Sequence, residues 1–199
     1  MHHKPQLTFK NEDRDFHEWH QGVTHYGLWA FIIKDEEWTN CLSNLQKKLS
    51  MYLHDEYQRQ PHITVFTCGL LPDGIQTKEI DRQAQEINKL AIKPFLMEFE
   101  SFHSFLNCPA LRVRFPGNSL TRIRTSLNNI LKEDRVAPVE PHATIGLYNG
   151  IYSIPEIFAR AQDTPVTLKP LLINEISYCV YETKSIKGPL QIINSVTFN

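Results

Sequence analysis

Two copies of one tetrapeptide pattern, Pro-His-x-Thr, carry the residues of this chain whose types and spacing could do chemistry. The first copy is Pro61-His62-Ile63-Thr64, and the second, Pro141-His142-Ala143-Thr144, places its histidine 80 residues further along. Histidine has an ordinary pKa of about 6.5, so it can accept or release a proton near neutral pH. A threonine hydroxyl can donate a hydrogen bond to a phosphate oxygen. Two such pairs suggest acid–base chemistry around one phosphate.

Each copy leads into an apolar, β-branched run that is typical of a strand. Residues two apart in a strand share a face, so His62 and Thr64 point the same way, as do His142 and Thr144. The apolar residue between them faces the opposite side, where it is expected to pack against helices. We therefore predict that these four residues form a catalytic site, with one histidine as base and the other as acid. The motifs leave open which histidine plays which role, because the two copies are equivalent.

Two aromatic residues beyond the motifs are weaker candidates for substrate binding. Tyr148 lies on the His142 face if its strand continues undistorted, and Phe66 occupies the related position after the first motif. An aromatic ring there could stack on a base or contact the phosphate. Packing of either ring in the core or at the rim of the site is an equally good interpretation.

Arginines supply the remaining candidates for substrate binding. Arg112 and Arg114 stand on the polar face of a strand that begins the second half of the chain. A guanidinium there could neutralise phosphate, although exposed arginines on an edge strand are commoner. Tyr57 and Arg59, just before the first motif, could form one wall of a cleft.

The histidine-rich N-terminus does not predict a metal site. His17-Glu18-Trp19-His20 lacks the spacing of the zinc-protease pattern, which needs two residues between the glutamate and the second histidine. No cluster of carboxylates or cysteines stands at ligand spacing. The sequence therefore predicts neither a metal nor a cofactor.

Composition limits the kind of partner. The 199 residues carry a formal net charge of −1, with 41% hydrophobic residues, which argues against a clamp on a long nucleic acid duplex. We expect a nucleotide or short oligoribonucleotide instead. No apolar run is long enough to span a membrane, the N-terminus lacks the apolar core of a signal peptide, and the four cysteines are scattered. A cytoplasmic monomer is the expectation.

Hydrophobic periodicity predicts the elements that must position these residues. After an N-terminal arm (1–24), each half reads strand, helix, histidine-bearing strand, helix, strand, which indicates a duplicated, pseudo-two-fold arrangement with a first lobe (25–108) and a second lobe (109–199) in one domain. The expected strands cover 26–33, 95–105, 110–115, 171–181 and 190–198, with motif strands running to about Gly69 and Asn149. The expected helices cover 35–52, 77–90, 119–133 and 155–161.

The paired motifs on this element order resemble the two-histidine (2H) phosphoesterase superfamily, which includes 2′-5′ RNA ligase-like proteins and cyclic nucleotide phosphodiesterases. The resemblance extends over roughly residues 25–199 and includes the closing Tyr181-Glu182-Thr183, the turn at Gly188-Pro189 and the last strand. It implies an α+β, bilobal fold in which two antiparallel-rich sheets line a central cleft, with the helices outside.

The same resemblance implies metal-independent cleavage of a cyclic phosphate or a 2′-5′ phosphodiester. His62 and His142 would act as base and acid, while Thr64 and Thr144 would hold the phosphate. Gly146 stands where many ligase-like members carry a basic residue. The alternative is a non-catalytic module that binds nucleotides or RNA ends in the same cleft.

Overall fold

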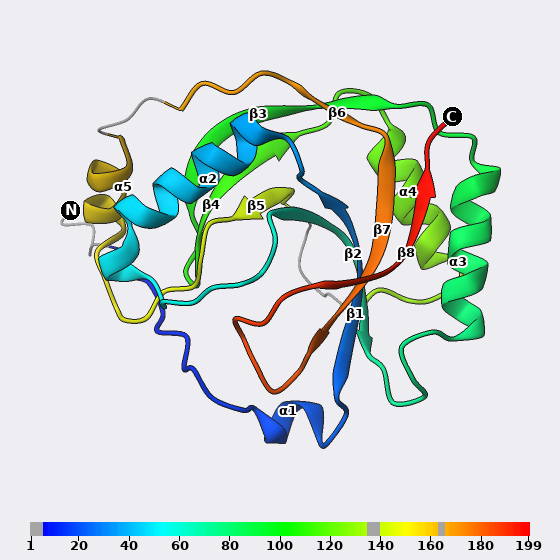
Figure 1. Cartoon of the computed structure of the whole chain (residues 1–199), viewed down its shortest axis with the longest axis horizontal. Helices are drawn as coiled ribbons and strands as arrows, with labels where there is room; N and C mark the ends of the chain where they lie inside the picture. Colours follow the sequence, from blue (N-terminus) through cyan, green and yellow to red (C-terminus); the bar gives the residue numbers. More distant parts are fainter. Residues whose placement is uncertain (1–5, 135–139, 163–165) are drawn as a thin grey trace.

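The computed structural model describes residues 6–134, 140–162 and 166–199, and within these ranges one curled antiparallel sheet organises the chain (Figure 1). Its strand order is β6-β3-β4-β5-β2-β1-β7-β8. The strands are β1 (His25–Ile32), β2 (His62–Leu70), β3 (Phe95–Ser104), β4 (Pro109–Arg114), β5 (His142–Thr144), β6 (Leu171–Ile173), β7 (Glu175–Glu182) and β8 (Gln191–Thr197). The helices are α1 (His17–His20), α2 (Glu36–Lys48), α3 (Lys78–Lys89), α4 (Ser119–Asn128) and α5 (Ile154–Gln162).

The two motif strands, β2 and β5, are the central pair of this sheet, with three further strands beyond each of them. Ile63 of β2 pairs with Ala143 of β5, and this contact joins two four-stranded halves into one sheet. The α+β class is therefore confirmed. The two sheets expected on either side of a cleft are continuous with each other through the motif strands.

The strand order does not follow the linear division of the chain at residues 108 and 109. β3 precedes that boundary but pairs with β4, which follows it after a short connection. β7 returns from the C-terminal part to pair with β1. Short connections between antiparallel strands favour pairing of neighbours along the chain, and this keeps β3 with β4. The strands of the two sequence halves are thus interleaved in space.

One face of the sheet packs against the helices. Alternating residues of the central strands, including Trp29, Phe31, Ile63 and Ala143, are at most 1% exposed and belong to the main core. α2 contributes to this core through Trp38, Leu42 and Leu45, whose spacing places them on one helical face. At the start of α2, the Asp35 carboxylate accepts a hydrogen bond from the backbone N–H of Trp38 at 3.1 Å, an N-cap that fixes where the helix begins.

The opposite face of the sheet carries the motif side chains. Ile32 pairs with His62 and Ala30 with Thr64, so these residues share a face. A small apolar cluster continues that face across β1 and β7: Leu28, Ala30, Cys179 and Leu190, with Ile32 and Tyr181 packed against it. We call this side of the sheet the motif face.

Three elements end earlier than expected. The predicted helix over 35–52 divides into α2 and a separate 3₁₀ turn at Ser50–Tyr52. α4 stops at Asn128 instead of continuing to Glu133, and β5 stops at Thr144 instead of running to Asn149. Within the described ranges, no helix has the length and apolarity that a membrane crossing requires.

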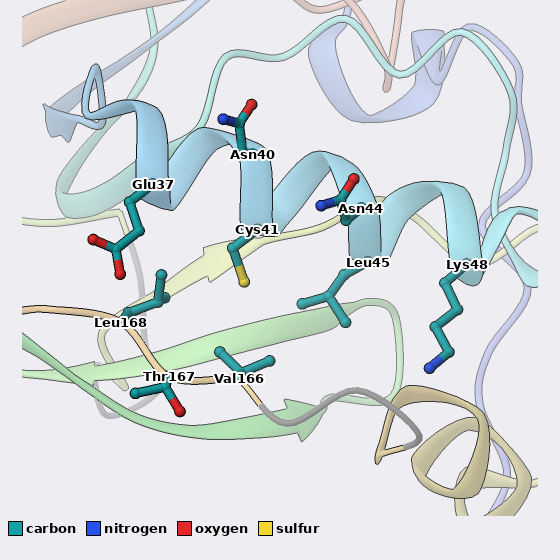
Figure 2. Close-up of a pocket in the computed structure, with 9 residues that line it drawn as sticks. All are labelled: Glu37, Asn40, Cys41, Asn44, Leu45, Lys48, Val166, Thr167 and Leu168. Carbon is teal, nitrogen blue, oxygen red and sulfur yellow. The ribbon is translucent and has the colours of Figure 1, made fainter.

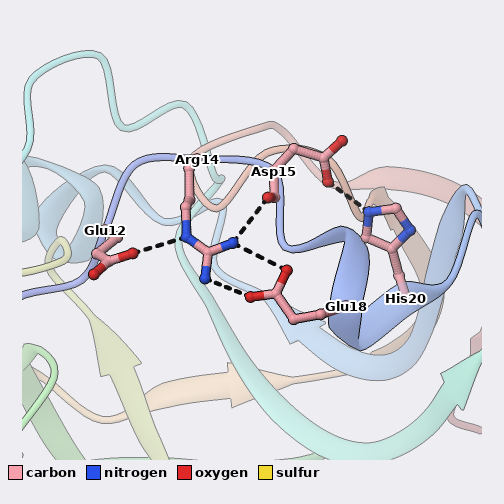
Figure 3. Close-up of polar contacts among 5 residues, drawn as sticks. All are labelled: Glu12, Arg14, Asp15, Glu18 and His20. Atoms are coloured by element: carbon pink, nitrogen blue, oxygen red, sulfur yellow. Dashed lines mark hydrogen bonds and ion pairs between the residues drawn. The ribbon is translucent and has the colours of Figure 1, made fainter.

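The N-terminal arm follows the second half of the sheet and then crosses towards the first. Asn11 donates its backbone N–H to the carbonyl of Tyr148, and Asp13 forms an ion pair of 2.7 Å with Lys187. Ion pairs from Arg14 to Glu12 and Glu18, and a hydrogen bond between His20 and Asp15, stabilise the local course of the arm into α1 (Figure 3).

Candidate functional site

The pairing of β2 with β5 brings the four predicted catalytic residues together. Because Ile63 lies opposite Ala143 in an antiparallel pair, one register step in either direction places His62 opposite Thr144 and Thr64 opposite His142. Directly opposed residues on one face have Cβ atoms about 5 Å apart, and diagonal neighbours such as the two histidines are about 7–8 Å apart. The four side chains therefore form a square of two imidazoles and two hydroxyls.

Both histidines are oriented by the same backbone contact. Nδ1 of His62 lies 2.7 Å from the carbonyl oxygen of Gln60, and Nδ1 of His142 lies 2.7 Å from that of Glu140. A carbonyl oxygen only accepts, so Nδ1 must carry the proton in each ring. This leaves Nε2 of each neutral imidazole as a proton acceptor, and each proline before the histidine restricts the backbone that holds it.

The two equivalent rings do not share all of their surroundings. Burial lowers the pKa of His62 to about 4, with smaller lowering contributions from the positive charge of Arg59 and from His142, against the raising effect of the Gln60 contact. Removal from water disfavours the charged imidazolium. His62 is therefore neutral at pH 7 in the free protein.

The neighbours of His142 come from β4 and from the end of β3. Arg112 is its direct cross-strand partner, and the ring of Phe105 lies 4.5 Å from the imidazole ring, centroid to centroid. Arg112 also forms ion pairs with Glu140 at 3.4 Å and Glu100 at 3.7 Å. Its guanidinium thus stands on the motif face with carboxylate partners already in place.

Arg114 lies two residues further out on β4. Its side chain is 68% exposed and is paired with Glu98 at 2.5 Å. Because β4 pairs with β5 only as far as Arg112, Arg114 is further from the square than Arg112 is. Phosphate binding by either arginine stays a prediction.

Phe66 lies in the core and not on the motif face, contrary to expectation. The pairing of β1 with β2 shifts register between Trp29 and Ala30, so that Phe66 lies opposite Trp29 while Thr64 lies opposite Ala30. Such a bulge interrupts the alternation of faces. Phe66 therefore turns to the helix side, where it is 0% exposed in the main core.

Tyr148 is also placed in the core instead of on the motif face. β5 ends at Thr144, so the strand alternation that predicted its orientation does not reach it. The tyrosine is 0% exposed, and its hydroxyl lies 2.7 Å from Oγ of Ser104. A side chain that is fully enclosed and hydrogen-bonded cannot stack on a nucleobase.

The backbone explains why no cation follows the second motif at Gly146. A Cβ atom added at this position would lie 2.9 Å from Cδ1 of Leu53, closer than real contacts allow. Leu53 is held there by a β-bridge to Tyr148. A longer side chain at position 146 would have to displace this leucine.

The sequence does not predict two residues near the site, Phe105 and Tyr181, and it gives a third, Arg59, only a minor role. Phe105 carries no signal beyond its place near the end of a predicted strand. Tyr181 is far from both motifs in the sequence, on β7. The sequence predicts Arg59 only as part of a cleft wall. The structure puts its guanidinium 4.1 Å from the centre of the Tyr181 ring.

Among the cavities in the described ranges, one borders the second motif and another is lined by no motif residue. One of about 340 Å³ is lined by α2, by residues 57–61 and by Thr144 and Ile145, so it borders the motif. Another of about 400 Å³ lies between α2 and residues 166–168 and contains Cys41 but no motif residue (Figure 2). The described residues hold no group of three histidine, cysteine, aspartate or glutamate side chains that could bind a metal ion.

Comparison with known proteins agrees with this fold. The chain is similar to LigT of E. coli, solved with 3′-AMP, at 13% identity over 88% of this chain and 99% of that chain, with a TM-score of 0.56. It is also similar to TT0787 of Thermus thermophilus, at 14% identity over 87% of this chain and 97% of that chain, with a TM-score of 0.60. No curated protein matches.

These structural likenesses concern the fold, and the family itself follows from sequence. The model of the 2′-5′ RNA ligase superfamily matches residues 35–184, a range that contains both motifs and most of the sheet. This agrees with the resemblance to 2H phosphoesterases that the motifs carry. The chain belongs to the 2′-5′ RNA ligase superfamily.

Proposed function

We propose that the protein is a metal-independent phosphodiesterase that cleaves a cyclic phosphate or a 2′-5′ phosphodiester in a nucleotide or short oligoribonucleotide. The observation that carries this proposal is the pairing of Ile63 with Ala143, which puts both motif histidines and both motif threonines on one face. Membership of the 2′-5′ RNA ligase superfamily and the similarity to LigT, which was solved with 3′-AMP, support the same substrate class.

The different surroundings of the histidines assign their roles in this proposal. His62 is neutral at pH 7 because burial lowers its pKa, so we assign it the role of the base. Nε2 of His62 accepts a proton from water as the water oxygen bonds to phosphorus. The bond from phosphorus to the leaving ribose oxygen breaks, and Nε2–H of His142 protonates that oxygen. The product is a phosphomonoester.

The threonines bind the phosphate during this step. Thr64 and Thr144 lie at opposite corners of the square, so their hydroxyls can donate to the two non-bridging oxygens. Donors held in place where charge develops stabilise the transition state more than water does. His142, the other histidine of the square, is then the acid.

The test is turnover of 2′,3′-cyclic nucleotides and of 2′-5′ linked oligoadenylate, each in the presence of a chelator. We expect His62→Ala and His142→Ala each to lower kcat by about 10²–10⁴-fold, the usual contribution of a positioned acid or base. His17→Ala is the matched control, because this histidine is exposed on α1 and contacts neither motif.

The outcomes separate the enzyme from its alternative. Tight binding of these ligands without turnover would favour a module that only binds nucleotides or RNA ends. Turnover that persists in both histidine variants would overturn the acid–base mechanism. Turnover that disappears only when the chelator is added would overturn its metal independence.

A further inference from the structure

The segment just before the first motif holds Arg59 in a fixed position. Its Nε donates to the carbonyl oxygen of Gly188 at 3.3 Å. On either side, Gln58 donates its backbone N–H to Lys187, and the Gln60 amide exchanges two hydrogen bonds with the backbone of Leu190, at 2.8 and 3.0 Å. Hydrogen bonds made by three successive residues therefore hold this segment, and with it the Arg59 guanidinium, in place.

The Tyr181 ring packs against the Arg59 guanidinium. The Arg59 Cζ atom lies 4.1 Å from the ring centre, within the range of a cation–π contact. Tyr181 pairs with Tyr26 across β7 and β1, and the two rings stack at 5.3 Å. This contact holds the guanidinium over the face of the Tyr181 ring.

The sheet order fixes the side of the square on which this cation lies. From His142 the strands run β5, β2, β1, β7, so Tyr181 lies beyond His62 on the side away from His142. Both residues are on the motif face, because Ile32 pairs with His62 and packs in the same cluster as Tyr181. The charge of Arg59 also acts on His62. The guanidinium therefore lies on the His62 side of the square, close enough for its charge to act on that histidine.

One nitrogen of this guanidinium has an unused hydrogen-bonding capacity. Nη2 of Arg59 is buried and has no hydrogen-bond partner among the described residues. A buried donor without an acceptor is unfavourable, and the planar fork of arginine matches the oxygens of a phosphate. By contrast, Arg112, the cation on the other side of the square, already has two carboxylate partners.

From this placement we infer that Arg59 and Tyr181 form a subsite for a second phosphate of the substrate. The inference rests on the proposed function, since it takes the square of histidines and threonines to hold the reacting phosphate. The ligand is then a nucleotide with an additional phosphate group or a short oligonucleotide, in preference to a mononucleoside with one phosphate. Arg59 is a specificity-determining residue that does not touch the reacting bond.

The test is binding, measured by calorimetry on the full chain, so it does not depend on turnover. The ligands are adenosine 3′-monophosphate, adenosine 3′,5′-bisphosphate and the dinucleotide ApAp, in which the second phosphate comes from a 5′ end or from an internucleotide link. We expect wild-type protein to bind at least one of the two-phosphate ligands about tenfold more tightly than adenosine 3′-monophosphate, as one charge-assisted contact allows.

Substitutions at Arg59 test whether it causes this preference. Arg59→Met should reduce the preference to about one, because it weakens binding of the two-phosphate ligands more than binding of adenosine 3′-monophosphate, and Arg59→Lys should retain part of the preference. Arg82→Met is the matched control, because it removes the same charge from an exposed position on α3. Melting temperatures of all variants show whether they fold.

The results that would overturn the inference are specific. The wild-type protein could bind neither two-phosphate ligand more tightly than adenosine 3′-monophosphate. Arg59→Met could keep the wild-type preference, or it could lose the same factor in affinity for all three ligands. If Arg59→Met does not fold, Arg59→Lys decides by the same ratios. A preference that depends on Arg59, in a protein without turnover, would support the subsite and reject the proposed enzyme.

Discussion

At the scale of single residues, the lowered pKa of His62 has two consequences that can be measured separately. The first concerns activity. As the proposed base, His62 must be neutral in the free protein, so kcat/KM should stay high as the pH falls towards 5 and decline only near pH 4, where its pKa lies. A pH profile of kcat/KM checks this, and an acid limb near the ordinary histidine pKa of about 6.5 would contradict the role of His62 as base.

The second consequence concerns stability. The unfolded chain holds this histidine at its ordinary pKa of 6.5, against about 4 when folded. Between these values the unfolded state binds more protons, so the free energy of unfolding falls as the pH is lowered from 6.5 to 4. We expect His62 to contribute about 3 kcal/mol to this loss, and urea unfolding of His62→Gln should show a correspondingly weaker pH dependence. An equal pH dependence in wild type and variant would contradict the burial argument.

The roles of the two histidines also predict different responses to the leaving group. A p-nitrophenolate leaves without needing a proton, so a nucleotide p-nitrophenyl diester should recover much of the rate that His142→Ala loses on a ribose leaving group. His62→Ala should stay impaired on both substrates, because the attacking water still needs a base. The reverse pattern in kcat would exchange the assignments of base and acid.

At the scale of elements, the short second motif strand depends on the segment that follows the 3₁₀ turn. A Cβ atom added at Gly146 would lie 2.9 Å from Cδ1 of Leu53, which is too close. Gly146→Ala should therefore lower the free energy of unfolding by about 1–2 kcal/mol. Leu53→Ala removes the obstructing atoms but leaves a cavity.

A double-mutant cycle isolates this contact. In the double variant, alanine at position 53 relieves the clash at position 146, so its loss of unfolding free energy should be smaller than the sum of the single losses by about 0.5 kcal/mol or more. Urea unfolding of the four proteins measures the difference. Additive losses would mean that the glycine is needed for its backbone conformation and not for close approach.

The elements also show how far the sequence predicts the site. Strand alternation alone places His62, Thr64, His142 and Thr144 on shared faces, and the β2–β5 pairing agrees with this. Alternation fails beyond them. The bulge opposite Trp29 moves the Phe66 side chain to the other face of the sheet, and β5 ends before Tyr148, so alternation no longer determines its orientation. Bulges and strand ends depend on neighbouring strands, which local periodicity does not contain. For the same reason, the stacking of Arg59 on Tyr181 has no sequence signal.

At the scale of the whole molecule, the charge is near balance, at −1, while the motif face carries Arg59 and Arg112 on opposite sides of the square. A molecule of this kind attracts an anion locally and not along an extended surface. Its affinity for nucleotides should therefore depend on salt only through the phosphate held in the square and the second phosphate at Arg59.

This predicts a small salt slope that does not grow with ligand length. Each phosphate neutralised in a single strand contributes about −0.7 to the slope of log K against log salt, so two contacts correspond to about −1.4. We expect a trinucleotide and a twelve-nucleotide RNA to give the same slope within error in titrations from about 50 to 300 mM salt. Arg59→Met should reduce it by about 0.7, and Arg82→Met should leave it unchanged. A slope that steepens with length would instead reveal a binding surface extending beyond the motif face, and the partner would then be a longer RNA.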